Sequence, residues 1–164
     1  MRFKFSILLV FLFTNSLLAQ TKMDKAIKKW NKENVPYIQV EELEMLDDVL
    51  LLDTRKIEEF SVSHIKNALW VGHKEFELNS ITERIEDKDK KIVVYCSIGV
   101  RSEDVGEKLL DAGYSNVQNL YGGIFEWKNK GYTVYDIEGN KTEKIHAFNK
   151  HWGKLLNNGD KVFD

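Results

Sequence analysis

The amino-acid sequence predicts an α/β domain with three layers, in which a mainly parallel central sheet of about five strands has helices on both faces. Two observations support this prediction. Apolar, β-branched segments alternate with short amphipathic segments between Tyr37 and Val134, as in a parallel sheet whose crossovers are helices. The segments 49–53 (VLLLD) and 91–96 (KIVVYC) are almost continuously apolar, which is typical of strands covered on both faces.

The remaining elements follow the same alternation. Further strands are expected at 37–40, 68–71 and 116–120, and helices at 21–35, 41–48, 55–60, 79–87, 102–113 and 122–131. Ser80 and Glu83 fit a capping box at the start of one helix. Gly113 stands where a left-handed residue is expected to end another.

The N-terminal residues 1–19 have the layout of a secretory signal peptide. Arg2 and Lys4 precede an apolar run from Phe5 to Phe13, and small and polar residues lead to a plausible cleavage site after Ala19. The run is short for a membrane span, which takes roughly 20 residues. We therefore expect an exported protein, periplasmic or secreted, without stable membrane insertion after cleavage.

Three further segments follow the signal: a helical lead-in at 20–36, the α/β domain at 37–136 and a tail at 137–164. In the tail, apolar residues fall at helical spacing and predict an amphipathic helix; they are Ile145, Phe148, Trp152, Leu155 and Leu156. This helix either packs back on the domain or docks a partner, and the sequence does not separate these alternatives.

Charge and cysteine content restrict the function. The formal net charge of −2 gives no basic field for phosphate neutralisation, so nucleic-acid binding is not expected. Cys96 is the only cysteine and cannot form an internal disulfide. A metal site is not expected, because one cysteine and four scattered histidines lack ligand spacing.

Cys96 ends the strongest predicted strand, and a helix is expected to begin near Ser102. Ligands of open α/β sheets bind at this edge, where the helix N-terminus favours an anion such as a thiolate. Gly99 lets successive amides converge on one point, and Arg101 supplies a cation with several donors. Such a thiolate can attack without a general base, which suits transfer of sulfur or of a phosphoryl group.

Three motifs resemble the rhodanese, or thiosulfate sulfurtransferase, family, between about Tyr37 and Val134. Residues 51–69 (LLDTRKIEEFSVSHIKNAL) are similar to its entry motif, 93–102 (VVYCSIGVRS) to its active-site loop, and 119–134 (NLYGGIFEWKNKGYTV) to its closing motif. The resemblance implies a rhodanese-like three-layer domain. It also implies sulfur transfer rather than dephosphorylation, because four residues separate Cys96 from Arg101, whereas the related phosphatases have five.

The resemblance implies a sulfurtransferase that carries sulfane sulfur as a Cys96 persulfide, and the signal-like N-terminus makes the expected protein an exported one. The expected donor is thiosulfate or another small anion, or a persulfide or polysulfide. The expected acceptor is a thiol or cyanide. A thiolate outside the cytosol is also expected to need a reducing partner. No cofactor is expected to be required. The expected substrate-binding residues are Ser97, Ile98, Gly99, Val100, Arg101 and Ser102.

Other positions in the motifs have supporting roles. Asp53 and Arg55 order the loops around the site, and Glu59 and His64 stabilise turns. Ser97 replaces a basic residue that several thiosulfate-using members carry, which weakens the case for thiosulfate.

Two alternatives remain from the sequence. One is a non-catalytic rhodanese-like binding module that docks a partner through the tail, and the other is a thiol that senses or stores oxidants.

Overall fold

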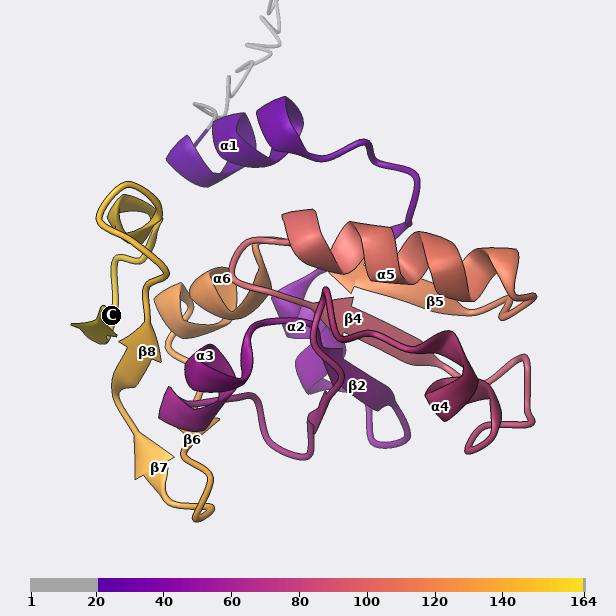
Figure 1. Cartoon of the computed structure of the whole chain (residues 1–164). Coiled ribbons are helices and arrows are strands. Elements are labelled where there is room, and N and C mark those ends of the chain that lie inside the picture. The colour runs from indigo at the N-terminus through magenta and orange to yellow at the C-terminus, as the bar shows by residue number, and fades with distance from the viewer. Residues whose placement is uncertain (1–20, 164) are drawn as a thin grey trace, which may run out of the picture.

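The computed structural model describes residues 21–163 of the chain, and its central feature is a five-stranded sheet in the order β1-β5-β4-β2-β3 (Figure 1). All neighbouring strands in it are parallel. The predicted fold class is therefore confirmed. The predicted signal peptide lies outside the described residues. The strands are β1 (Tyr37–Ile38), β2 (Leu50–Asp53), β3 (Leu69–Trp70), β4 (Ile92–Tyr95) and β5 (Val117–Leu120).

Helices cover both faces of this sheet. They are α1 (Lys22–Trp30), α2 (Val40–Glu44), α3 (Ile57–Val62), α4 (Leu78–Thr82), α5 (Val100–Asp111) and α6 (Gly123–Asn129). Within residues 21–163, no helix combines the length and the apolar character needed to cross a membrane.

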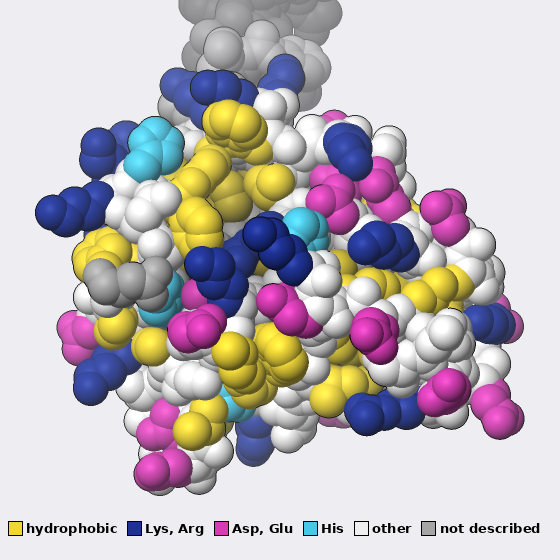
Figure 2. Space-filling view, viewed as in Figure 1, with side chains coloured by type: hydrophobic (Ala, Val, Ile, Leu, Met, Phe, Trp, Pro, Cys, Tyr) yellow, Lys and Arg dark blue, Asp and Glu magenta, His cyan; other side chains and the backbone are white. Residues whose placement is uncertain are grey.

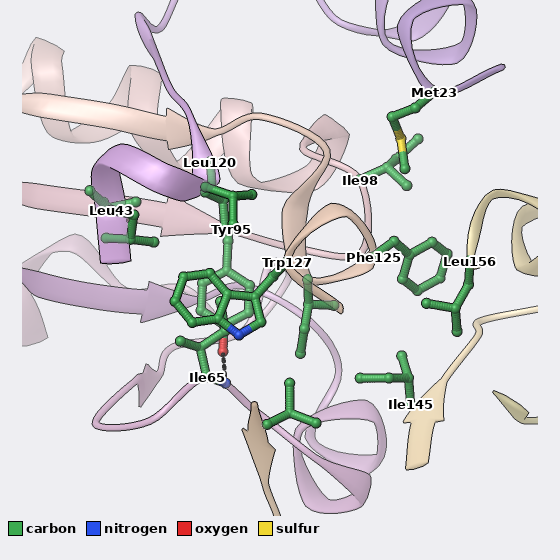
Figure 3. Packing of buried hydrophobic residues seen from close by; sticks show 14 of the residues in the cluster. Met23, Leu43, Ile65, Tyr95, Ile98, Leu120, Phe125, Trp127, Ile145 and Leu156 are labelled. Carbon is green, nitrogen blue, oxygen red and sulfur yellow. Dashed lines mark hydrogen bonds between the residues drawn. The ribbon is translucent and has the colours of Figure 1, made fainter. Parts of the chain in front are cut away.

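Alternate residues of β4 enter two different cores. Val93 and Tyr95 pack with α1, α2 and α6, whereas Ile92 and Val94 pack with α4 and α5. Figure 3 shows the first of these cores, in which the Tyr95 hydroxyl accepts a hydrogen bond from the Ile65 N–H at 3.2 Å. The central strand is buried on both faces, so its continuous apolar run is needed.

The helix α4 begins earlier than its sequence indicates. Glu77 occupies the N-cap position, and the Ser80 hydroxyl lies inside the helix and donates to the Glu77 carbonyl oxygen at 2.7 Å. The predicted capping box of Ser80 and Glu83 is therefore wrong. The Ser80 hydroxyl bonds back to the preceding turn, as hydroxyls inside helices often do.

The predicted amphipathic helix in the tail is also wrong. The tail instead forms β7 (Lys141–Thr142), which pairs with β6 (Val134–Tyr135), and β8 (Lys144–His146), which pairs in parallel with β9 (Asp160–Val162). One short 3-10 helix, η1 (Trp152–Leu155), lies between β8 and β9.

Local backbone chemistry explains this departure. Phe148 has φ of +63°, which interrupts a right-handed helix. The Asn149 side chain then accepts hydrogen bonds from the N–H groups of His151 and Trp152 at 2.9 and 3.0 Å, and such local bonds compete with helix formation. The apolar residues at helical spacing therefore lie in separate elements, Ile145 in β8 and Trp152 and Leu155 in η1, and not in one helix.

The tail packs against the domain rather than standing free. Ile145, Ala147 and Leu156 are fully buried in the core that also contains α6, and Figure 3 shows Ile145 and Leu156 beside Phe125. The Asn129 side chain donates to the Leu155 carbonyl at 2.9 Å and accepts from the Asn157 N–H at 2.6 Å. Four of the five apolar residues that suggested partner docking thus pack against the domain core: Ile145, Trp152, Leu155 and Leu156.

Candidate active site

The thiol of Cys96 lies at the carboxyl end of β4, between this strand and the start of α5. Its residue is only 1% exposed, and the Gly99 N–H donates to its Sγ at 3.1 Å. Gly99 has φ of +107° and caps α5, so the loop turns back toward the sulfur. The sequence correctly places Cys96 in a strand-to-helix loop, and the structure shows that this loop encloses it.

The other amides of the loop are oriented by bonds to its carbonyl groups. The N–H groups of Ile124 and Phe125, at the start of α6, donate to the carbonyls of Cys96 and Ser97 at 2.9 and 3.1 Å. The two groups of a trans peptide point in opposite directions. The N–H groups that follow these carbonyls, those of Ser97 and Ile98, therefore point away from α6.

The carbonyl of Gly99 is held from a second side. It accepts hydrogen bonds from the Asn119 side chain at 2.8 Å and from the Asn31 side chain at 3.1 Å. The Ser102 hydroxyl is completely buried and donates to Asn119 Oδ1 at 2.7 Å. Ser102 therefore lies behind the loop and fixes Asn119, while the Val100 N–H points away from Asn119.

Arg101 makes a bidentate ion pair with Glu59. Its Nη1 and Nη2 atoms lie 2.6 and 2.8 Å from the two carboxylate oxygens, and Nη2 also donates to the Ser97 hydroxyl at 2.9 Å. Ser97 in turn donates to Glu59 at 3.1 Å. The three side chains form a closed ring of hydrogen bonds, which we call the Glu59–Arg101–Ser97 ring.

The charges in this ring balance locally. Burial opposes ionisation of Glu59, but its hydrogen bonds and charge interactions with Arg101 outweigh burial and lower the pKa of Glu59 to about 2. Glu59 therefore remains ionised at neutral pH. The positive charge of the Arg101 guanidinium is therefore largely compensated by Glu59 when no substrate is bound.

Asp53 and Arg55 form a second buried ion pair. Both side chains are completely buried, and Arg55 Nη2 lies 2.6 Å from Asp53 Oδ2. Arg55 also donates to the Ser63 carbonyl at 2.6 Å, and its own carbonyl accepts from the Trp70 indole at 2.8 Å. This pair ties the ends of β2 and β3 to the chain after α3.

A small pocket of about 140 Å³ opens at Cys96. The loop forms one side through Ser97, Ile98, Val100 and Arg101, and three aromatic side chains form the rest: Trp30, Phe148 and Trp152. Trp30 and Trp152 meet edge to face with ring centroids 5.9 Å apart. Figure 2 shows hydrophobic side chains gathered between α1 and the tail, above a group of Lys and Arg side chains.

The sequence predicts the loop residues as one site, but it does not predict the side chains that surround this loop. It assigned Glu59 to a turn, and Glu59 does accept from the Lys56 N–H at 3.0 Å, yet it also holds Arg101 from 42 positions away. The aromatic residues carry no motif of their own. Among residues 21–163, no group of three or more His, Cys, Asp or Glu side chains could hold a metal ion.

Comparison with protein families identifies this arrangement. The family described as the rhodanese-like domain matches residues 39–130, more than half of the chain. The chain belongs to this family.

Solved structures and curated relatives agree with this assignment at the level of the domain. A rhodanese-related protein from Thermoplasma volcanium is 30% identical with a TM-score of 0.52, over 60% of this chain and 96% of that one. The thiosulfate sulfurtransferase from Pseudomonas aeruginosa shares the fold with a TM-score of 0.57 and 24% identity, over 74% of this chain and 23% of that one.

The curated relatives are longer proteins. A tRNA uridine(34) hydroxylase from Photorhabdus laumondii is 38% identical over 57% of this chain and 28% of its own length. One of the same name from Hamiltonella defensa is 40% identical over 49% of this chain and 23% of its own length. The chain therefore spans about a quarter of the length of these relatives.

Proposed function

We propose that this rhodanese-like protein is a sulfurtransferase that carries sulfane sulfur as a persulfide on Cys96. The observation that carries this proposal is the geometry of the loop around Cys96. The loop encloses a buried thiol, the Gly99 N–H already donates to the sulfur, and four residues lie between Cys96 and Arg101. A persulfide made there would find amide donors fixed in advance, which is how such loops stabilise an anion.

The reaction runs in two displacements. The Cys96 thiolate attacks the outer sulfur of a donor, a new S–S bond forms at Sγ, and the old S–S bond breaks with its electron pair leaving on the donor's remainder. Thiosulfate would leave as sulfite and an organic persulfide as a thiolate. An acceptor thiolate or cyanide then attacks the outer sulfur, and the electron pair of the broken bond returns to Sγ.

The structure favours a persulfide or polysulfide over thiosulfate as the donor. Thiosulfate is a dianion and needs an uncompensated cation near the thiol. The Arg101 cation is compensated by Glu59, and Ser97 contributes a hydroxyl where several thiosulfate-using members have a basic residue. Efficient use of a dianion would require the Glu59–Arg101–Ser97 ring to open.

We further propose that the protein acts after export, which rests on the signal-like pattern in residues 1–19. A reducing partner or a thiol acceptor must then keep Cys96 reduced outside the cytosol, because a thiolate that reacts with sulfur donors is also open to irreversible oxidation there. Cell fractionation with N-terminal sequencing of the mature chain tests the expected cleavage after Ala19. Recovery of the uncleaved chain from the cytoplasm would contradict it.

The names of the curated relatives point to tRNA, but these relatives are about four times as long as the region that matches this chain. The matched region here is the rhodanese-like domain, and the formal net charge of −2 gives no support for a tRNA-binding surface. The shared domain therefore supports the cysteine chemistry only.

Intact mass spectrometry after incubation with a polysulfide tests the function. Wild-type protein should gain the mass of one sulfur atom, cyanide should remove it, and Cys96→Ser should never gain it. Wild type without an adduct, or Cys96→Ser with one, would refute the proposal.

A further inference from the structure

Three of the eight residues that line the Cys96 pocket, which we call its aromatic wall, lie outside the family-matched region. Trp30 belongs to α1, and Phe148 and Trp152 belong to the tail, whereas the match covers residues 39–130. These aromatic side chains therefore add to the rhodanese-like domain a surface that the Cys96 loop does not provide.

The wall is built into the fold. Phe148 is held at φ of +63°, a backbone state that is unfavourable for a bulky residue, and its ring lies 5.1 Å from the Arg101 guanidinium carbon. The buried residues Ala147 and Leu156 anchor the chain on both sides of Phe148 and Trp152. On the opposite side, Ile98 of the loop packs in the same core as Met23 of α1, and Figure 3 shows the two side by side.

The charge inside this pocket is as informative as its shape. Arg101 is the one charged residue among those that line it, and the bidentate pair with Glu59 compensates that charge. An anionic group would lose its hydration there without gaining an unpaired cation, which costs free energy. An uncharged aromatic or aliphatic group would bury apolar surface against three rings, which is favourable.

We infer that the sulfur acceptor of Cys96 is a small organic thiol whose carbon part is uncharged and apolar, and that Trp30, Phe148 and Trp152 bind this part. The inference rests on the proposed sulfurtransferase function. A volume of about 140 Å³ admits a group of this size but not a folded protein surface.

Sulfur leaves Cys96 by a second displacement at the outer sulfur of the persulfide. The acceptor R–SH loses its proton to solvent, and the R–S⁻ thiolate attacks the outer sulfur of the Cys96 persulfide. The bond from R–S to that sulfur forms while the bond to Cys96 Sγ breaks, and the electron pair remains on Sγ. The products are an organic persulfide and the Cys96 thiolate.

The experiment compares two thiols that differ in charge but resemble each other in thiol acidity, 2-phenylethanethiol and 3-mercaptopropanesulfonate. The full-length protein is loaded with polysulfide, freed of excess donor and mixed with either thiol, and quenched samples give the loss of the sulfur adduct by intact mass. Wild type should be discharged at least about tenfold faster by the phenyl thiol, because burial of a ring is worth that much or more.

Two pocket variants and one control variant test whether the aromatic side chains cause the difference between the two discharge rates. Trp152→Ala should lower the ratio of the two rates about fivefold or more, because the phenyl group loses apolar contact. Trp30→Ala should lower it in the same direction, and its half-exposed side chain (51%) makes this the variant least prone to unfold. Phe163→Ala removes an exposed tail aromatic that does not line the pocket, and it should leave the ratio unchanged.

The outcomes separate the two proposals. Absence of sulfur on Cys96 would refute the sulfurtransferase function and this inference with it. Normal loading followed by equal rates with both thiols would refute only the apolar acceptor. An unchanged ratio in both Trp30→Ala and Trp152→Ala, or discharge by a protein thiol and by neither small thiol, would also refute it.

Discussion

Replacement of Glu59 by glutamine tests whether the ion pair beside the thiol is a major source of stability. The pKa of Glu59 is lowered from 4.5 to about 2, and this difference corresponds to about 3 kcal/mol of interaction that favours the folded state. Glutamine has the same shape and keeps one oxygen acceptor for Arg101. We therefore expect Glu59→Gln to lower the free energy of unfolding by about 2–3 kcal/mol at pH 7.

The pH dependence follows from the direction of the shift. Because the pKa of Glu59 is lower in the folded protein, its contribution is complete above pH 4.5 and is lost as the pH falls toward 2. The difference in unfolding free energy between wild type and Glu59→Gln should therefore shrink over this interval. Urea unfolding followed by circular dichroism at a series of pH values measures it.

The neighbouring carboxylate provides a matched control. Glu58 is exposed on the same helix, so Glu58→Gln removes the same formal charge and should change stability by less than about 0.5 kcal/mol. If Glu59→Gln behaves like Glu58→Gln at pH 7, or if its difference from wild type does not depend on pH, the reasoning about the Glu59–Arg101–Ser97 ring is refuted.

Two further changes test the supports of the loop. A Cβ on Gly123 would lie 2.3 Å from the Cys96 carbonyl oxygen, whereas one on Gly131, which also has positive φ, would meet nothing within 4 Å. Gly123→Ala should therefore slow sulfur loading and destabilise well beyond the roughly 1–2 kcal/mol expected of Gly131→Ala; equal losses would show that backbone conformation alone matters. Asp53→Asn leaves the completely buried Arg55 charge without its carboxylate and should cost about 3–5 kcal/mol, measured by urea unfolding. A loss below about 1 kcal/mol would contradict the view that this pair holds the loops together.

The sequence was informative where neighbouring residues determine the structure. The continuous apolar runs of 49–53 and 91–96 became the central strands β2 and β4, because a strand buried on both faces needs apolar residues at every position. The position of Cys96 followed directly, since a thiol just after such a strand must lie at the carboxyl edge of the sheet. Gly113 takes φ of +89°, as its place after α5 predicts.

Contacts between distant segments were not predictable in the same way. Nothing near Glu59 indicates that its carboxylate meets Arg101 rather than solvent, because the contact depends on how α3 docks beside the loop. The predicted helix in the tail was wrong for a different reason. The apolar spacing of the tail fits a helix, but the Asn149 side chain bonds to nearby backbone N–H groups, and the burial of Ile145 and Leu156 in the domain core decides the outcome.

The parallel pairing of β8 with β9 also determines when the site becomes complete. During synthesis the chain emerges from its N-terminus. The loop around Cys96 is therefore present before Trp152 and before β9, which holds the tail in register. A nascent chain that still lacks the tail would carry the thiol and its amides without Phe148 and Trp152. The pairing of β8 with β9 therefore determines when aromatic side chains first cover the thiol.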